Sequence, residues 1–125
     1  MTIQECYQTL GGDLAKVLSR LPSVGLVTKF ITKFLEDSSF SQLCQALQNG
    51  QREEAFRAAH TLKGVCANLG FDRLMASAGK LTELLRPEGS EIPEAAALLL
   101  EDVKQDYATT VQAIRACLGL DSRSE

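Results

Sequence analysis

The sequence predicts an all-α domain, an antiparallel up-down four-helix bundle with short helices on its N-terminal side. Apolar residues recur at spacings of three and four in every segment of the 125-residue chain, and no alternating strand pattern is present. Hydrophobic residues make up 45% of the chain, enough to bury a core without disulfides or metal. The connections between the periodic segments are short, which favours antiparallel neighbours.

Capping and stop residues delimit the expected helices. A first short helix ends at Gly11-Gly12, Asp13 caps a second, and Pro22-Ser23 starts a longer one. Asn49-Gly50 and Gly70 are C-terminal signals. The four substantial helices are expected at roughly 24–36, 39–49 paired with 52–69, 71–86 and 93–118. We expect one domain over residues 1–125, with its core at about 13–118.

Composition excludes several classes of function. The net charge is −3 and acids and bases are mixed, so a nucleic-acid partner is not expected. No apolar run approaches the roughly 18 residues of a membrane span, and the N-terminus lacks the order of a signal peptide. We therefore expect a cytoplasmic protein without membrane insertion. The four cysteines lie far apart without a CxxC pair, which favours reduced thiols packed as small apolar residues over a zinc site.

The only histidine, His60, points away from the apolar stripe of its helix. On a wheel of about 100° per residue the stripe comprises Ala55, Ala59, Leu62, Cys66 and Leu69. His60, Gly64 and Ala67 fall on a different face. Because glycine inside a helix costs about 1 kcal/mol relative to alanine, the bare surface at Gly64 predicts close approach of another molecule.

An exposed neutral imidazole is a competent nucleophile, and Lys63 on the flank can reach an anion attached to the ring. The chain has no GxxxxGK[ST] loop, no HExxH and no readable Ser–His–Asp arrangement. We expect the domain to supply a nucleophile while a partner brings the reaction. Two other interpretations stay open here, a plain interaction bundle and a metal or cofactor bundle. The latter lacks the paired Glu and Glu-x-x-His motifs it needs.

The segment Ala59-His60-Thr61-Leu62-Lys63-Gly64, followed by Leu69-Gly70, resembles the signature of histidine-containing phosphotransfer (HPt) domains. Every fixed position of A-H-x-L-K-G-x-x-x-x-L-G is matched. The similarity extends to the order of a helical cap and a four-helix bundle over nearly the whole chain. It implies that His60 accepts a phosphoryl group, that Lys63 neutralises its charge, and that Gly64 leaves room for the partner.

The resemblance also implies the partners. In that family the histidine exchanges phosphate with an aspartate of a response-regulator receiver domain in a multistep phosphorelay. We expect a receiver and/or a hybrid sensor histidine kinase as partner, and a monomeric phosphocarrier rather than an enzyme. It would have no cofactor or ATP site of its own, and Mg²⁺ would be bound by the receiver. The alternative is a helical module that binds a receiver or other partner without phosphotransfer.

Further residues are candidates for contacts with the phosphoryl group or the receiver. Thr82 and Arg86 are four apart on the next helix, and Thr82 stands where some relatives have Gln. Ala67 extends the row of small residues beside His60. On the early helices the candidates for an apolar docking surface are Leu14, Val17 and Leu18. The sequence leaves open the cognate kinase, the direction of transfer, and whether the domain stands alone or belongs to a hybrid kinase.

Overall fold

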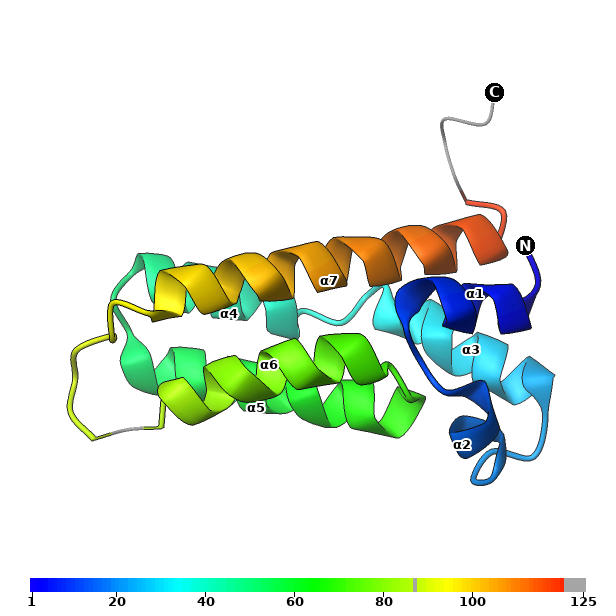
Figure 1. The fold of residues 1–125 in the computed structure, drawn as a ribbon, viewed down its shortest axis with the longest axis horizontal. Helices are drawn as coiled ribbons and strands as arrows, with labels where there is room; N and C mark the ends of the chain where they lie inside the picture. The colour runs from blue at the N-terminus through cyan, green and yellow to red at the C-terminus, as the bar shows by residue number, and fades with distance from the viewer. Residues whose placement is uncertain (87, 121–125) are drawn as a thin grey trace.

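A computed structural model describes residues 1–86 and 88–120, and all regular elements in these ranges are helices. They are α1 (Ile3–Leu10), α2 (Leu14–Leu18), α3 (Val24–Phe34), α4 (Ser39–Gln48), α5 (Arg52–Leu69), α6 (Asp72–Leu84) and α7 (Ala96–Cys117). Helices α4 to α7 lie side by side, each running opposite to the one before it (Figure 1). The predicted all-α bundle is therefore confirmed.

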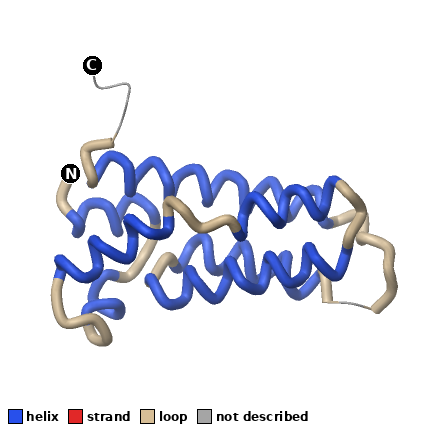
Figure 2. Tube along the Cα trace, turned by 180° about the vertical axis from the view of Figure 1, so that it is seen from behind, coloured by secondary structure: helices blue, strands red, loops and turns tan. Residues whose placement is uncertain are grey.

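The membership of the bundle differs from the prediction in one respect. Residues 39–49 and 52–69 were expected as two helices that count together as one of the four members, and α4 and α5 are indeed two helices but form separate antiparallel members. The reversal occurs at Gly50, whose φ of 68° is a left-handed conformation that favours glycine. Helix α3 contacts α2 and α5, and its chain leads on towards α4 (Figure 2).

Three helix boundaries differ from the prediction by two or three residues: α3 ends at Phe34 instead of near residue 36, and the other two boundaries lie beside the α6–α7 connection. Helix α6 ends at Leu84, three residues before Pro87 in the sequence, and the guanidinium of Arg52 binds the main-chain carbonyls at that end. Helix α7 begins at Ala96, three residues after Pro93. The carbonyl of Pro93 accepts from the amide of Ala96 at 3.0 Å, so these residues form a turn before the α-helical bonding pattern begins.

An aromatic cluster joins the N-terminal helices to the bundle. Phe71 lies at the start of α6. The centroid of its ring is 5.1 Å from that of Phe34, in an edge-on arrangement, and 5.8 Å from that of Tyr7. All three side chains are almost fully buried. Their burial removes apolar surface of three separate segments from water, which stabilises the packing of α1 and α3 against the α5–α6 turn.

The backbone of the α1–α2 turn binds the α5–α6 turn directly. The amide of Asp13 donates to the carbonyl of Gly70 at 2.9 Å, and the amide of Arg73 donates to the carbonyl of Gly11 at 3.1 Å. A Cβ on Gly12 would lie only 2.5 Å from the carbonyl oxygen of Gly70. Glycine is required at position 12 because two main chains meet there.

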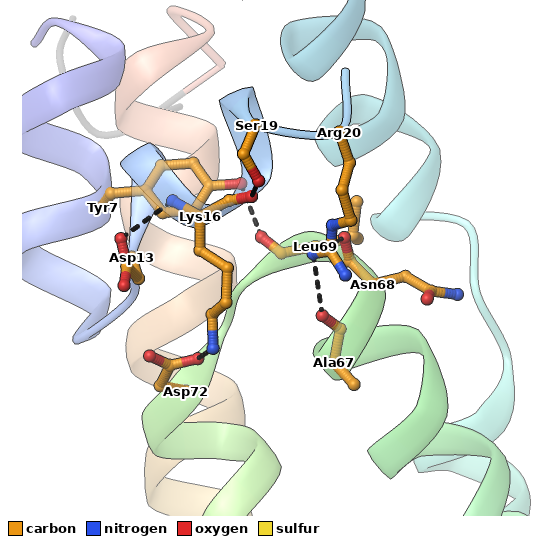
Figure 3. A network of polar contacts seen from close by, with 9 residues as sticks. All are labelled: Tyr7, Asp13, Lys16, Ser19, Arg20, Ala67, Asn68, Leu69 and Asp72. Carbon is orange, nitrogen blue, oxygen red and sulfur yellow. Dashed lines mark hydrogen bonds and ion pairs between the residues drawn. The ribbon is translucent and has the colours of Figure 1, made fainter.

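Side chains from the same N-terminal region hold the end of α5 (Figure 3). The hydroxyl of Tyr7 donates to the carbonyl of Leu69 at 2.7 Å. Lys16 pairs with Asp72 at 3.2 Å. The guanidinium of Arg20 donates to the carbonyls of Ala67 and Asn68 at 3.3 and 3.0 Å. The bonds from Tyr7 and Arg20 reach carbonyls at the end of α5, and together with the Lys16–Asp72 pair they fix the C-terminal half of the helix that carries His60.

Candidate functional site

Helix α5 presents His60 to solvent, as the sequence predicts. All five residues of the predicted apolar stripe are buried, at positions 55, 59, 62, 66 and 69. His60, Thr61 and Gly64 are exposed, and Ala67 is half-buried further along the same side of the helix. The burial of one stripe orients the whole helix, so the packing of the stripe determines where His60 points.

The surface beside His60 is open at Gly64. A Cβ placed on Gly64 would meet no other heavy atom within 4 Å. Gly64 lies inside a regular helix, so neither a turn nor a crowded contact within the described residues requires glycine there. The small residue therefore leaves space one turn from His60 for something outside the chain.

Lys63 leaves α5 and extends across α6. Its Cδ and Cε atoms lie 3.6 Å from the position that a Cβ on Gly79 would occupy, which is ordinary van der Waals contact. Because Gly79 has no side chain, the aliphatic stem of Lys63 can lie against α6 at this position. The side chain is half-buried through its stem, as is usual for a lysine that keeps its ammonium in water.

Aromatic and charged side chains adjoin the imidazole on the side facing the C-terminal end of α6. The ring of Phe56 lies 5.9 Å from that of His60, one helical turn away. The guanidinium of Arg86 lies 5.5 Å from the centroid of Phe56. Arg86 also forms two hydrogen bonds with the carboxylate of Glu83, at 2.9 and 3.0 Å. Phe56 and Glu83 were not among the sequence candidates, since their proximity to His60 depends on how α5 and α6 pack.

The carboxylate of Glu83 is held in its charged form. The hydrogen bonds from Arg86 are the main cause of its lowered pKa, and desolvation opposes them. The positive charges of Arg86 and Lys63 lower this pKa further. Two cationic side chains, one from each side of the α5–α6 contact, therefore act on one exposed carboxylate.

Thr82 is not available to a phosphoryl group or a partner, which corrects its candidacy. It is fully buried, and its hydroxyl donates to the carbonyl of Ala78 at 2.7 Å. Arg86 is exposed, as the candidacy requires. The spacing of four did not place these two residues on one face, because Arg86 lies beyond the end of α6 at Leu84.

The apolar candidates on α2 are also mostly buried. Leu14 and Val17 pack into the core, and only Leu18 is exposed, at 36%. Their burial follows from the contact of α2 with the α5–α6 turn, where Gly70 has no room for a Cβ because Val17 approaches so closely. Leu14 and Val17 are therefore excluded as docking residues in this conformation.

An apolar groove of about 340 Å³ lies between α3 and α5 instead. Phe30, 37% exposed, and Val65 line it together with Leu21, Phe34 and Leu69, and its polar lining is supplied by Lys33, Asp37 and Asn68. Phe30 belongs to the apolar pattern of α3, and its exposure could not be read from that pattern. None of the helices in the described part of the chain is long and apolar enough to cross a membrane.

Comparison with known families decides the classification. The family model described as Hpt domain matches residues 26–118, from α3 to the residue after α7. The chain belongs to the Hpt domain family. No curated protein and no solved structure matches it. Hpt domains are phosphocarrier modules that carry out histidine phosphotransfer in two-component phosphorelays and interact with response-regulator receivers. The matched range of this Hpt domain includes His60, Lys63 and Gly64.

Proposed function

We propose that His60 is the phosphoacceptor of this Hpt domain, in a multistep phosphorelay. The observation that carries the proposal is an exposed imidazole beside the open surface of Gly64, within the matched family range. His60 would take the phosphoryl group from one receiver aspartate and donate it to another. The domain would act as a monomer and without a cofactor of its own, and the receiver would bring the Mg²⁺.

The transfer is a displacement at phosphorus. The lone pair of one ring nitrogen of His60 attacks the aspartyl phosphate, and the N–P bond forms as the O–P bond to the aspartate breaks. The aspartate leaves as a carboxylate, while the other ring nitrogen keeps its proton, so the ring becomes a cation carrying the phosphoryl group. The reverse reaction returns the group to a receiver. Such transfers depend chiefly on positioning and on neutralising phosphoryl charge.

Lys63 and Arg86 are the proposed sources of that neutralisation. Both side chains come from the side of the imidazole where α5 meets α6. Lys63 contacts α6 at Gly79 through its aliphatic stem, so its ammonium stays free to meet an anion. Two nitrogens of Arg86 bind the carboxylate of Glu83, so this guanidinium would have to exchange that partner for the phosphoryl group.

The receiver is proposed to dock along the row His60, Gly64 and Ala67. The α3–α5 groove borders α5 at Val65, next to Gly64 in the chain, and offers apolar surface at Phe30. An interface of this kind combines an apolar contact with a reactive centre that the docked partner shields from water. The groove replaces the buried residues of α2 as the proposed apolar part of the interface.

A transfer assay tests the proposal. A receiver domain carrying labelled aspartyl phosphate and Mg²⁺ is mixed with the chain and with a His60→Gln variant. We expect acid-labile, base-stable label on the wild type and none on the variant. Phosphoramidate, a small phosphoryl donor, serves as a partner-independent arm. A folded wild type that takes label from neither source would contradict the acceptor role and favour a module that only binds.

A further inference from the structure

The carboxylate of Glu83 lies among the groups that the proposed phosphoryl chemistry uses. Arg86 donates to both of its oxygens, at 2.9 and 3.0 Å. The same guanidinium lies over Phe56, which in turn contacts His60. A continuous set of contacts therefore joins Glu83 on α6 to the imidazole on α5.

Lys63 contacts α6 from the other helix. Its stem passes over Gly79, which is four residues before Glu83 and therefore one turn away on the same side of α6. Among the described residues the Lys63 ammonium forms no ion pair with Glu83 within 4 Å, so Lys63 acts on this carboxylate through space.

We propose that Glu83 is a positioning residue that takes the place of the phosphoryl group in the unphosphorylated domain. It holds Arg86 beside Phe56 and His60, and after phosphorylation it competes with the phosphoryl group for Arg86 directly and for Lys63 through space. This inference rests on the proposed function of His60. No covalent bond to Glu83 is involved.

The difference in charge between the phosphoryl group and the carboxylate determines which of them binds the cations more strongly. A phosphoryl group carries about two negative charges, so it attracts Lys63 and Arg86 more strongly than one carboxylate does. Glu83 nevertheless remains nearby as a like charge that shares the same cations. The phosphorylated state is therefore less stable than it would be with a neutral residue at position 83, and the domain gives up its phosphoryl group more readily to a receiver.

A purely structural role would make Glu83 an ordinary surface ion-pair partner. The chain contains a matched example of such a pair on α7, where Glu101 and Lys104 have the same spacing of three and lie 3.5 Å apart. The side chains of Glu83 and Glu101 are 59% and 66% exposed. Glu101→Gln is therefore a suitable control for Glu83→Gln, because both changes remove one carboxylate charge from an exposed pair and preserve side-chain shape.

The test measures the coupling between residue 83 and the phosphoryl group in the folded protein. The wild type, Glu83→Gln and Glu101→Gln are phosphorylated with phosphoramidate, and His60→Gln shows that the label depends on His60. Each protein is then unfolded in urea at alkaline pH with and without its phosphoryl group. The effect of phosphorylation on the unfolding equilibrium is compared across the three proteins, which isolates the pairwise interaction.

We expect phosphorylation to favour the folded state of Glu83→Gln about twofold to fivefold more than that of the wild type, the range of exposed ion pairs. Glu101→Gln should behave as the wild type does. The difference should shrink at about 1 M salt, where the screening length is about 3 Å. An equal effect of phosphorylation in Glu83→Gln and wild type would overturn the inference while leaving His60 as acceptor. A wild type that phosphoramidate does not label would instead refute the acceptor role, and the inference with it.

Discussion

The hydroxyl of Tyr7 donates a 2.7 Å hydrogen bond to the main-chain carbonyl of Leu69, 62 residues further along the chain. The carbonyl belongs to the last residue of α5, where the helix no longer supplies a partner. Tyr7 thus connects the first helix of the chain to the end of the helix that carries His60. Helix α5 is therefore held by a residue outside the α5–α6 pair, and its rigidity depends on the N-terminal helices.

Replacing Tyr7 with phenylalanine should lower the free energy of unfolding by about 1–3 kcal/mol. The substitution keeps the buried ring but leaves the Leu69 carbonyl without its side-chain donor. Urea unfolding measures the change. Tyr107→Phe is the matched control, because that ring stacks on Phe40 and its hydroxyl has no protein partner among the described residues. Equal stability of the wild type and Tyr7→Phe would show that water replaces the lost bond at no cost.

Gly64→Ala should stabilise the protein and at the same time slow phosphoryl transfer from a receiver. The new methyl group enters open space within a helix, so the free energy of unfolding should rise by up to about 1 kcal/mol. Transfer from a receiver should slow by about tenfold or more, since displacement of a reacting centre by about 1 Å costs up to a hundredfold. Labelling by the small donor phosphoramidate should be little affected.

Gly25→Ala is the control for this substitution, because its Cβ would also have ordinary space, 3.8 Å from the hydroxyl of Ser23 in the first turn of α3. Receiver assays and urea unfolding on both variants provide the comparison. If Gly64→Ala transferred at the wild-type rate, close approach of the partner at Gly64 would be disproved.

Arg52→Met should destabilise the protein by about 2 kcal/mol. The guanidinium of Arg52 donates to the carbonyls of Leu84, Leu85, Arg86 and Glu91, and the bonds to Arg86 and Glu91 are 2.8 and 2.6 Å long. Removing it leaves the C-terminal end of α6 without these charge-assisted bonds. The residue also anchors the main chain of Arg86, so the variant should weaken the contact of Arg86 with Phe56.

Arg57→Met on the same helix should have little effect on the free energy of unfolding, at most about 0.5 kcal/mol. Its only polar partner among the described residues is Glu53 in an exposed pair. Thermal or urea unfolding of both variants tests the difference. Similar losses for the two arginines would mean that the bonds to the α6 carbonyls do not contribute to stability.

The protein should lose stability in alkali through its buried thiols. Burial raises the pKa of Cys6 and of Cys66 to about 12, with Cys117 and Asp37 respectively contributing further. In the unfolded chain these thiols ionise near pH 9. The unfolded state therefore releases protons first as the pH rises, and the free energy of unfolding should fall between about pH 9 and 12.

The slope should approach about 1.4 kcal/mol per pH unit for each thiol. Urea unfolding at several pH values measures it, and Cys66→Ala should remove one thiol's share of the slope. A Cys66→Ala variant with the same pH dependence as the wild type would show that this thiol is not protected from ionisation by burial.

Much of the site could be predicted because it depends on one helix. The periodic burial of α5 placed Ala55, Leu62 and Cys66 inside and therefore His60 outside, and all of these positions agree with the structure. Gly50 and Gly70 were recognised as helix ends because left-handed residues favour glycine. These features depend on residues within one or two helical turns of each other, and such short-range relations can be recognised in the sequence.

Relations between helices were not predictable in the same way. Thr82 and Arg86 were grouped by their spacing, but the end of α6 lies between them and only Arg86 reaches the surface near Phe56. Leu14 and Val17 were assigned to a docking surface, whereas contact with the α5–α6 turn buries both. Glu83 was overlooked because nothing in its local sequence connects it with α5.

The sequence by itself determined the helical class, most helix ends and the outward face of His60, because backbone hydrogen bonding and periodic burial act over a few residues. Only the tertiary structure decided that Lys63 crosses Gly79, that Arg86 joins Glu83 to the ring of Phe56 next to the imidazole, and that Tyr7 holds the end of α5. Those relations follow from the rotation and crossing of packed helices. Many side chains at once determine that packing, and no single segment specifies it.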